Sequence, residues 1–167
     1  MSNFRGEIFN SQPQEYDEDL GYVYKKSFHS EKHENFGNKN FTTYSDRIRS
    51  NISKNIDYFK KIKFEQITFN RDKAIIITGD SFIVGNEVGN HETIPAQLEK
   101  LSNIRILNGG VGGYSFIQTI LLSEKLIIDK EINNLIVSLI PEDLIRSEYS
   151  SYQGAPRPFY KKKNNQL

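Results

Sequence analysis

The chain has 167 residues, which is enough for one domain with a sizeable core. Its 22 Lys and Arg nearly balance its 21 Asp and Glu, so its charge gives no reason to expect nucleic acid or an anionic membrane as a partner. It has no cysteine, which excludes disulfides and thiolate metal sites, and no apolar run approaches the ~20 residues needed to cross a bilayer. The polar start has no apolar segment typical of a secretory signal, so we expect the cytoplasm as the default location.

Residues 1–70 are predicted to form an arm that precedes the main domain. The first part is polar, with many Tyr and Phe side chains and little periodicity, which indicates an irregular arm ordered by aromatic packing. Over residues 44–62, apolar side chains recur at spacings of three and four, which predicts an amphipathic helix. An extended lead-in is the alternative, because Asn and Ser weaken helix propensity. Residues 64–69 predict a short strand. The apolar side chains of the helical pattern are Ile48, Ile52, Ile56, Phe59 and Ile62.

Residues 71–167 are predicted to form the main domain, in which apolar strands alternate with helices. The three predicted strands are residues 74–78, 104–107 and 135–140. Short apolar runs of this kind are typical of strands buried on both faces. Thr93 and Ser115 are placed to cap the two intervening helices, and the polar tail from residue 150 is predicted to be a loop. The order predicts a doubly wound three-layer α/β/α fold with a mainly parallel sheet. Right-handed crossovers then bring the loops after the strands to one edge of the sheet.

These loops carry the side chains that predict a reactive site. A glycine directly after the first strand permits a sharp turn, and Ser81 just past it lies where open α/β sheets bind ligands. Residues 108–115 form a glycine-rich loop, whose bare backbone N–H groups can approach a ligand closely. The third loop supplies Glu142 and Asp143. A serine hydroxyl beside free backbone donors is the arrangement that acyl transfer needs, with a nucleophile and an oxyanion hole.

Three blocks in this order carry a family resemblance: I-T-G-D-S-F-I-V-G, N-G-G-V-G-G-Y and S-L-I-P-E-D-L-I-R. Over residues 74–149 the chain resembles the SGNH or GDSL hydrolase family, which contains esterases, lipases, thioesterases and enzymes that deacetylate carbohydrates or transfer acetyl groups. The resemblance implies a flavodoxin-like fold with strand order 2-1-3-4-5, of which this chain supplies the first three strands. It implies no cofactor and no metal. The implied substrate is a small acyl ester or an acetylated carbohydrate.

By this resemblance Ser81 is the nucleophile, and the backbone N–H groups of Ser81 and Gly113 are oxyanion donors. The third donor of the family is an Asn side chain, but Glu142 stands at the matching position. An ionised carboxylate cannot donate a hydrogen bond, so this replacement weakens the expected oxyanion hole. Asp80 and Asn108 are expected to fix their loops by bonding nearby backbone groups. Asp143 is a further supporting residue.

The expected general base is missing from the sequence. The family supplies it from an Asp-x-x-His near the C-terminus, and none of the three histidines follows an Asp at that spacing. His91, in the loop after the nucleophile turn, is interpreted as a surface residue, and His29 and His33 lie in the arm. The last two strands and the histidine would lie beyond Leu167, which leaves the third strand as an open apolar edge. We therefore expect a truncated chain, one piece of a split protein, or a chain that needs a partner or oligomer at that edge. Alternatively, the arm pairs with that edge.

Two other functional classes compete with this hypothesis. With no visible base, the same fold could bind a carbohydrate or an acyl group without turnover, as a catalytically impaired module. Gly110-x-Gly112 after a strand also resembles part of a dinucleotide-binding fingerprint, but Ser115 stands in place of its third glycine. The main hypothesis is therefore a serine esterase of the SGNH type that cleaves or transfers an acyl ester.

Overall fold

The computed structural model describes residues 13–34, 37, 39–52, 70–152 and 154–161. The centre of this part of the chain is a parallel sheet of three strands, β5 (Ile75–Gly79), β6 (Ile106–Gly110) and β7 (Asn134–Val137). β5 lies in the middle, so the strand order is β6-β5-β7. Ile76 and Leu107 are at most 1 % exposed, because β5 and β6 are covered on both faces. The predicted α/β class with a parallel sheet is thus confirmed.

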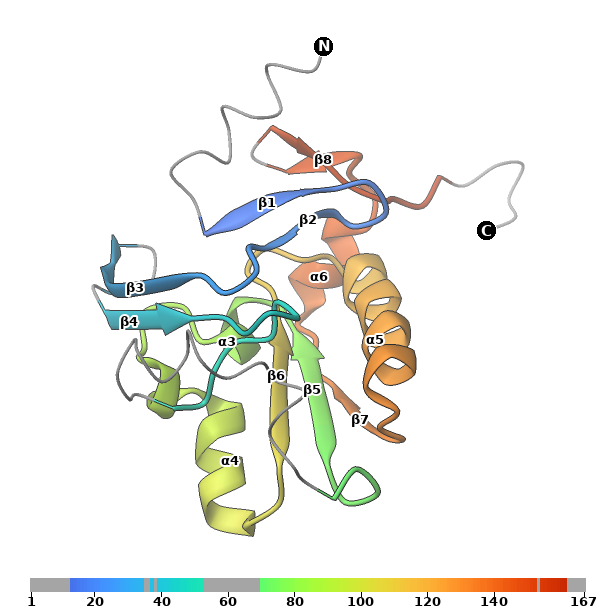
Figure 1. The fold of residues 1–167 in the computed structure, drawn as a ribbon. Helices are drawn as coiled ribbons and strands as arrows, with labels where there is room; N and C mark the ends of the chain where they lie inside the picture. The colour runs from blue at the N-terminus through green and yellow to red at the C-terminus, as the bar shows by residue number, and fades with distance from the viewer. Residues whose placement is uncertain (1–12, 35–36, 38, 53–69, 153, 162–167) are drawn as a thin grey trace.

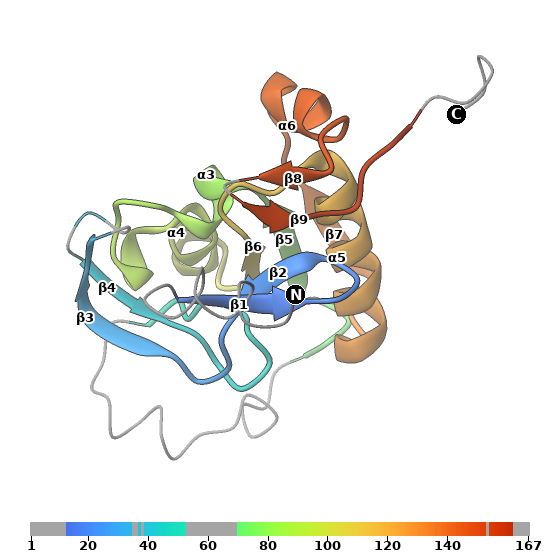
Figure 2. The same ribbon diagram turned by 90° about the horizontal axis from the view of Figure 1, so that it is seen from above.

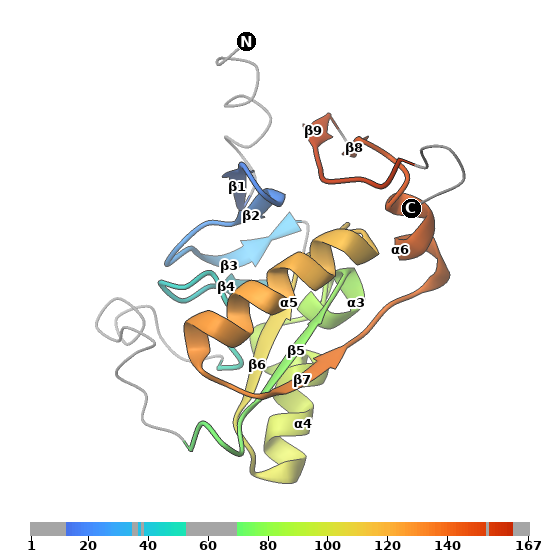
Figure 3. The same ribbon diagram turned by 90° about the vertical axis from the view of Figure 1, so that its right-hand side faces the viewer.

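Helices cover both faces of this sheet (Figure 3). In the part of the chain that the structure describes, the helical elements include α3 (Ser81–Val84), η3 (Asn90–Glu92), α4 (Ile94–Ser102), α5 (Phe116–Lys130) and α6 (Pro141–Arg146). α5 lies on one face, whereas α3 and α4 lie on the other. The predicted caps are confirmed, because Thr93 and Ser115 each accept a hydrogen bond from a backbone N–H in the first turn of the following helix.

The N-terminal region forms two antiparallel hairpins where the sequence predicted an irregular arm. Their strands are β1 (Gln14–Asp17), β2 (Gly21–Tyr24), β3 (His29–His33) and β4 (Lys39–Thr42). The hairpin of β1 and β2 lies above the carboxyl ends of β5 and β6 (Figure 1). All four residues of β2 are buried, so its sequence has no alternation that could reveal a strand. As predicted, aromatic side chains anchor this region, and Tyr22, Tyr24 and Phe41 are at most 3 % exposed.

The helix predicted over residues 44–62 is wrong for its described part. The chain makes a tight turn there, in which Tyr44 N donates to the Ile48 carbonyl oxygen, and Arg49 forms an isolated bridge with Asn108 of β6. After this turn the chain is extended and not helical. In the extended chain the Arg49 side chain reaches backbone carbonyl groups at and beyond the end of α3, which favours this conformation. The rest of the predicted helix, and the short strand predicted after it, lie outside the described residues.

β7 is an edge strand and not the buried strand predicted over residues 135–140. It pairs with β5 along one side, and within the described residues no strand pairs with its other side. Ile136 of β7 is 47 % exposed and Leu139, just after the strand, is 46 % exposed, so apolar side chains at this edge of the sheet lie partly in solvent. The expected open apolar edge is therefore present in this part of the chain. Among the described residues of the arm, Arg49 bridges to Asn108 of β6 instead.

The C-terminal region folds back across the carboxyl end of the sheet (Figure 2). After α6, the two-residue strands β8 (Ser151–Tyr152) and β9 (Ala155–Pro156) form a small hairpin where the sequence predicted a loop. This hairpin lies so close to β2 that a Cβ on Gly21 would be 2.0 Å from the Pro156 carbonyl oxygen. Gly21 also has φ +80°, so glycine is required at this crossing. In the described part of the chain, no helix is long and apolar enough to span a membrane.

Candidate active site

The turn after β5 places Ser81 at the carboxyl end of the central strand. Gly79 is needed in this turn, because a Cβ would lie 2.7 Å from Ile83 Cγ1. Asp80 is buried and caps α3, since its Oδ1 accepts a hydrogen bond from Phe82 N at 3.0 Å. Ser81 is half-buried as the first residue of α3. Neither its hydroxyl nor its backbone N–H has a hydrogen-bond partner among the described residues.

The glycine-rich loop starts beside this turn, because β5 and β6 pair in register up to Gly79 and Gly110. Asn108 is fully buried, and its Oδ1 accepts a hydrogen bond from Gly110 N at 3.1 Å, which is the kind of local bond predicted for it. A Cβ on Gly110 would lie 2.3 Å from Val84 N, so the end of β6 touches the backbone of α3. Gly113 has φ +76°, which favours glycine, and its N–H is unpaired within the described structure.

Two tyrosines of the N-terminal hairpin hold this loop. Tyr22 Oη donates to the Gly112 carbonyl oxygen at 3.1 Å, and Gly112 N donates to Tyr24 Oη at 3.2 Å. The peptide group that carries the Gly113 N–H is therefore bonded through its carbonyl. Burial raises the pKa of Tyr24 to about 12 and that of Tyr22 still further, so both phenols keep their protons. Sequence reasoning missed these residues, because Tyr22 lies 90 positions away from Gly112 and no motif connects the two.

Arg146 links the three loops. Its Nη1 lies 2.7 Å from Asp143 Oδ1, 3.5 Å from Asp80 Oδ2 and 3.4 Å from the Tyr114 carbonyl oxygen. Asp143 also caps α6, because its Oδ2 accepts a hydrogen bond from Ile140 N. Burial raises the pKa of Asp143, and the nearby Asp80 carboxylate adds to this effect, whereas Arg146 opposes it. The sequence predicted Asp80 and Asp143 as supporting residues, but no sequence pattern indicated Arg146 between them.

Neither Glu142 nor any of the three histidines is hydrogen-bonded to Ser81 in the described part of the chain. Glu142 is exposed on the first turn of α6. His29 bonds side chains of its own hairpin, and His33 is buried at 9 % exposure in the same hairpin. His91 is exposed in η3. The structure thus brings Ser81 and Gly113 to adjacent loops. It does not place Glu142 or a histidine of the described residues where it could take the proton of Ser81.

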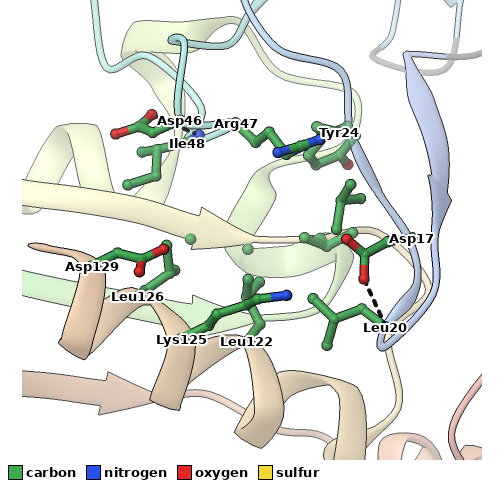
Figure 4. A pocket seen from close by; sticks show the side chains of 14 residues that line it. Asp17, Leu20, Tyr24, Asp46, Arg47, Ile48, Leu122, Lys125, Leu126 and Asp129 are labelled. Carbon is green, nitrogen blue, oxygen red and sulfur yellow. Dashed lines mark hydrogen bonds between the residues drawn. The ribbon is translucent and has the colours of Figure 1, made fainter.

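A separate pocket of about 110 Å³ opens between the N-terminal hairpin and α5 (Figure 4). Leucine side chains line it together with charged ones, which include Asp17, Lys125 and Asp129. Ser81 and Gly113 are not among its lining residues. Within the described ranges, no group of three or more acidic or histidine side chains could hold a metal ion.

Comparison with known proteins adds no family to this picture. No protein-family model matches the chain, and no curated protein matches it. The function must therefore be inferred from the residues and their geometry.

Proposed function

We propose that this protein is a serine hydrolase of the SGNH or GDSL type that cleaves or transfers an acyl ester. The observation that carries this proposal is the pair of adjacent loops bearing Ser81 and Gly113, each with a backbone N–H that is unpaired within the described residues. Donors of this kind suit an oxyanion, because they need no rearrangement when negative charge develops. The strand order β6-β5-β7 supports a flavodoxin-like sheet, in which ligands bind at the carboxyl ends of the strands.

In the proposed reaction, Ser81 Oγ attacks the carbonyl carbon of the ester, and the carbonyl oxygen becomes an oxyanion. The N–H groups of Ser81 and Gly113 donate hydrogen bonds to that oxygen. The bond to the leaving oxygen then breaks, and that oxygen takes up the proton that Ser81 gave away and departs as the alcohol. Water or a sugar hydroxyl attacks the acyl-serine, takes the acyl group, and its proton restores the Ser81 hydroxyl. The Ser81 proton has to pass to a base, and none is hydrogen-bonded to the hydroxyl within the described residues. Glu142 cannot serve as a third donor while it is ionised.

The substrate that we propose is a small acyl ester or an acetylated carbohydrate, and this choice comes from the family resemblance. The chemistry needs no cofactor, because the nucleophile and the oxyanion donors belong to the chain itself. The proposal also includes a partner strand beside β7, since natural proteins cover or pair an apolar edge of this kind.

A fluorophosphonate probe followed by peptide mapping tests the nucleophile. The probe bonds covalently to an activated serine hydroxyl, so we expect the label on the peptide that contains Ser81. Ser81→Ala should lose the label, whereas Ser150→Ala, at an exposed serine outside the three loops, should keep it. An unlabelled Ser81 in the folded wild-type protein, under conditions that label an active serine esterase, would contradict the proposal.

A binding module without turnover is the second candidate, because the described residues place no base against Ser81. An activated acetyl ester separates the two functions. A hydrolase releases a burst of alcohol that matches the amount of protein, whereas a binding module releases none. A module should also bind an acetylated sugar with equal affinity in the wild type and in Ser81→Ala.

A further inference from the structure

Arg157 is buried beside the glycine-rich loop and, within the described residues, lacks most of the partners that a buried guanidinium needs. It is 5 % exposed and follows β9 directly. Its Nη2 donates to the Gly113 carbonyl oxygen at 3.2 Å, and its Cζ lies 4.6 Å from the centre of the Tyr152 ring. Within the described residues its Nε and Nη1 are buried without a hydrogen-bond partner, and no carboxylate pairs with it.

Two other arginines of this chain show how a guanidinium is satisfied when its role is structural. Arg49 is 1 % exposed, and its nitrogens donate to four backbone carbonyl oxygens and to the Asn90 side chain. Arg146 lies between two carboxylates. Arg157 is nearly as buried as Arg49 but has a single acceptor in the described structure, so its environment is of a different kind.

A guanidinium keeps its positive charge even in such a place. Burial lowers the pKa of Arg157, but a guanidinium is so strong a base that it stays protonated near neutral pH. An unpaired buried charge destabilises the folded state, and proteins retain destabilising groups of this kind at sites where they serve function. We propose that Arg157 is the receptor for an anionic group, a carboxylate or a phosphate, on a ligand that binds at the glycine-rich loop.

This inference rests on the proposed function and names the substrate class of the same site, an acyl ester that carries a negative charge. Gly113 connects the two roles, because its carbonyl oxygen accepts the Arg157 hydrogen bond and its N–H is the proposed oxyanion donor. An anion held by Arg157 therefore lies next to the residue that meets the reacting carbonyl. Tyr152 covers the guanidinium and is half-buried, so its ring has to shift to admit the anion.

Thermal unfolding with added phosphate tests the anion site without any turnover. At constant ionic strength, phosphate should raise the unfolding temperature of the wild-type protein to a saturating value, because a ligand of the folded state stabilises it. Arg157→Gln should weaken phosphate binding by about ten- to a hundredfold, the range for a lost hydrogen bond to a charged group. Without phosphate, this variant should unfold at an unchanged or higher temperature. Arg49→Gln should unfold at a lower one, since it leaves buried carbonyl groups without donors.

Equal phosphate binding by the wild type and Arg157→Gln overturns the inference, and so does a wild type that binds neither phosphate nor acetate. If the Gln variant does not fold, Arg157→Lys decides the question. The lysine ammonium cannot form the paired hydrogen bonds of the planar guanidinium, so Arg157→Lys should bind phosphate several-fold more weakly than the wild type. Unchanged binding would again overturn the inference. Ser81→Ala should bind phosphate as the wild type does, so a failed nucleophile and a failed anion site give different results.

A pair of activated esters links the anion to the substrate class. Nitrophenyl hemisuccinate carries a carboxylate, whereas nitrophenyl butyrate has an acyl chain of similar length without charge. The wild type should have a higher kcat/KM for the charged ester than for the uncharged one. Arg157→Gln should lose this preference, because residue 157 then has no positive charge to bind the carboxylate. The same preference in both proteins overturns the substrate class, even where phosphate binds.

Discussion

Tyr22 is the residue through which the N-terminal hairpin reaches the proposed oxyanion hole. Its hydroxyl bonds the peptide that carries the Gly113 N–H, and a donated hydrogen bond polarises and orients such a peptide. Tyr22→Phe keeps the packed ring but should lower the rate of fluorophosphonate labelling at Ser81 about tenfold, less than the loss of a whole donor. Tyr149→Phe, at a side chain that is 57 % exposed, is the control and should label at the wild-type rate. Unchanged labelling in Tyr22→Phe would exclude this positioning role.

His33 should make the stability of the folded protein depend on pH. Burial lowers the pKa of His33 below its ordinary value of 6.5, so the unfolded chain binds this proton at a higher pH than the folded one. The free energy of unfolding should therefore fall as the pH drops through 6.5 towards the folded-state pKa. Urea unfolding between about pH 7.5 and about pH 5 should show this slope in the wild type and a flatter one in His33→Gln. His91→Gln, at an exposed histidine, should keep the wild-type slope, and an equal slope in His33→Gln would refute the assignment.

At the scale of elements, the contact between β6 and α3 sets the position of Ser81, the proposed nucleophile. Gly110→Ala places a Cβ against the backbone at Val84 N, which cannot give way without moving α3. We expect a loss of about 1–3 kcal/mol in the free energy of unfolding, together with slower labelling of Ser81. Gly112→Ala is the matched control two residues on, because its nearest atoms would lie at 3.4 Å, an ordinary contact. Denaturant unfolding measures the free energy of unfolding of both variants. Equal losses of stability in Gly110→Ala and Gly112→Ala would argue against a specific contact with α3.

At the scale of the whole molecule, the open edge of β7 should promote self-association. Its outer side is unpaired in the described structure, the strand also carries the half-exposed Ile136 on one face, and unpaired apolar edges pair readily with other strands. Ile136→Lys should reduce the concentration-dependent increase in particle mass measured by light scattering, with little change in stability. Leu101→Lys removes a side chain that is 81 % exposed on α4, where no strand edge is present. A larger reduction in Leu101→Lys than in Ile136→Lys would place the self-association on the helix.

The central strands and the site loops could be predicted because their signals are local. A β-branched run followed by glycine indicates β5 and its turn, and the hydroxyls of Thr93 and Ser115 mark the helices that follow their loops. Other features depend on contacts between distant residues. Ile48 fits a helical spacing, yet the chain is extended there because Arg49 binds carbonyl groups near α3. β2 is covered on both faces and so shows no alternation.

The sequence by itself determined the α/β class, the place of Ser81 and the glycine-rich loop beside it, because short-range apolar runs and turn residues encode them. The tertiary structure alone decided what surrounds that loop. Tyr22 comes from a hairpin 90 positions earlier, and Arg157 comes from a tail 44 positions later. Neither follows from a local pattern, because hydrogen bonds and buried charges depend on which distant segments the packed core brings together.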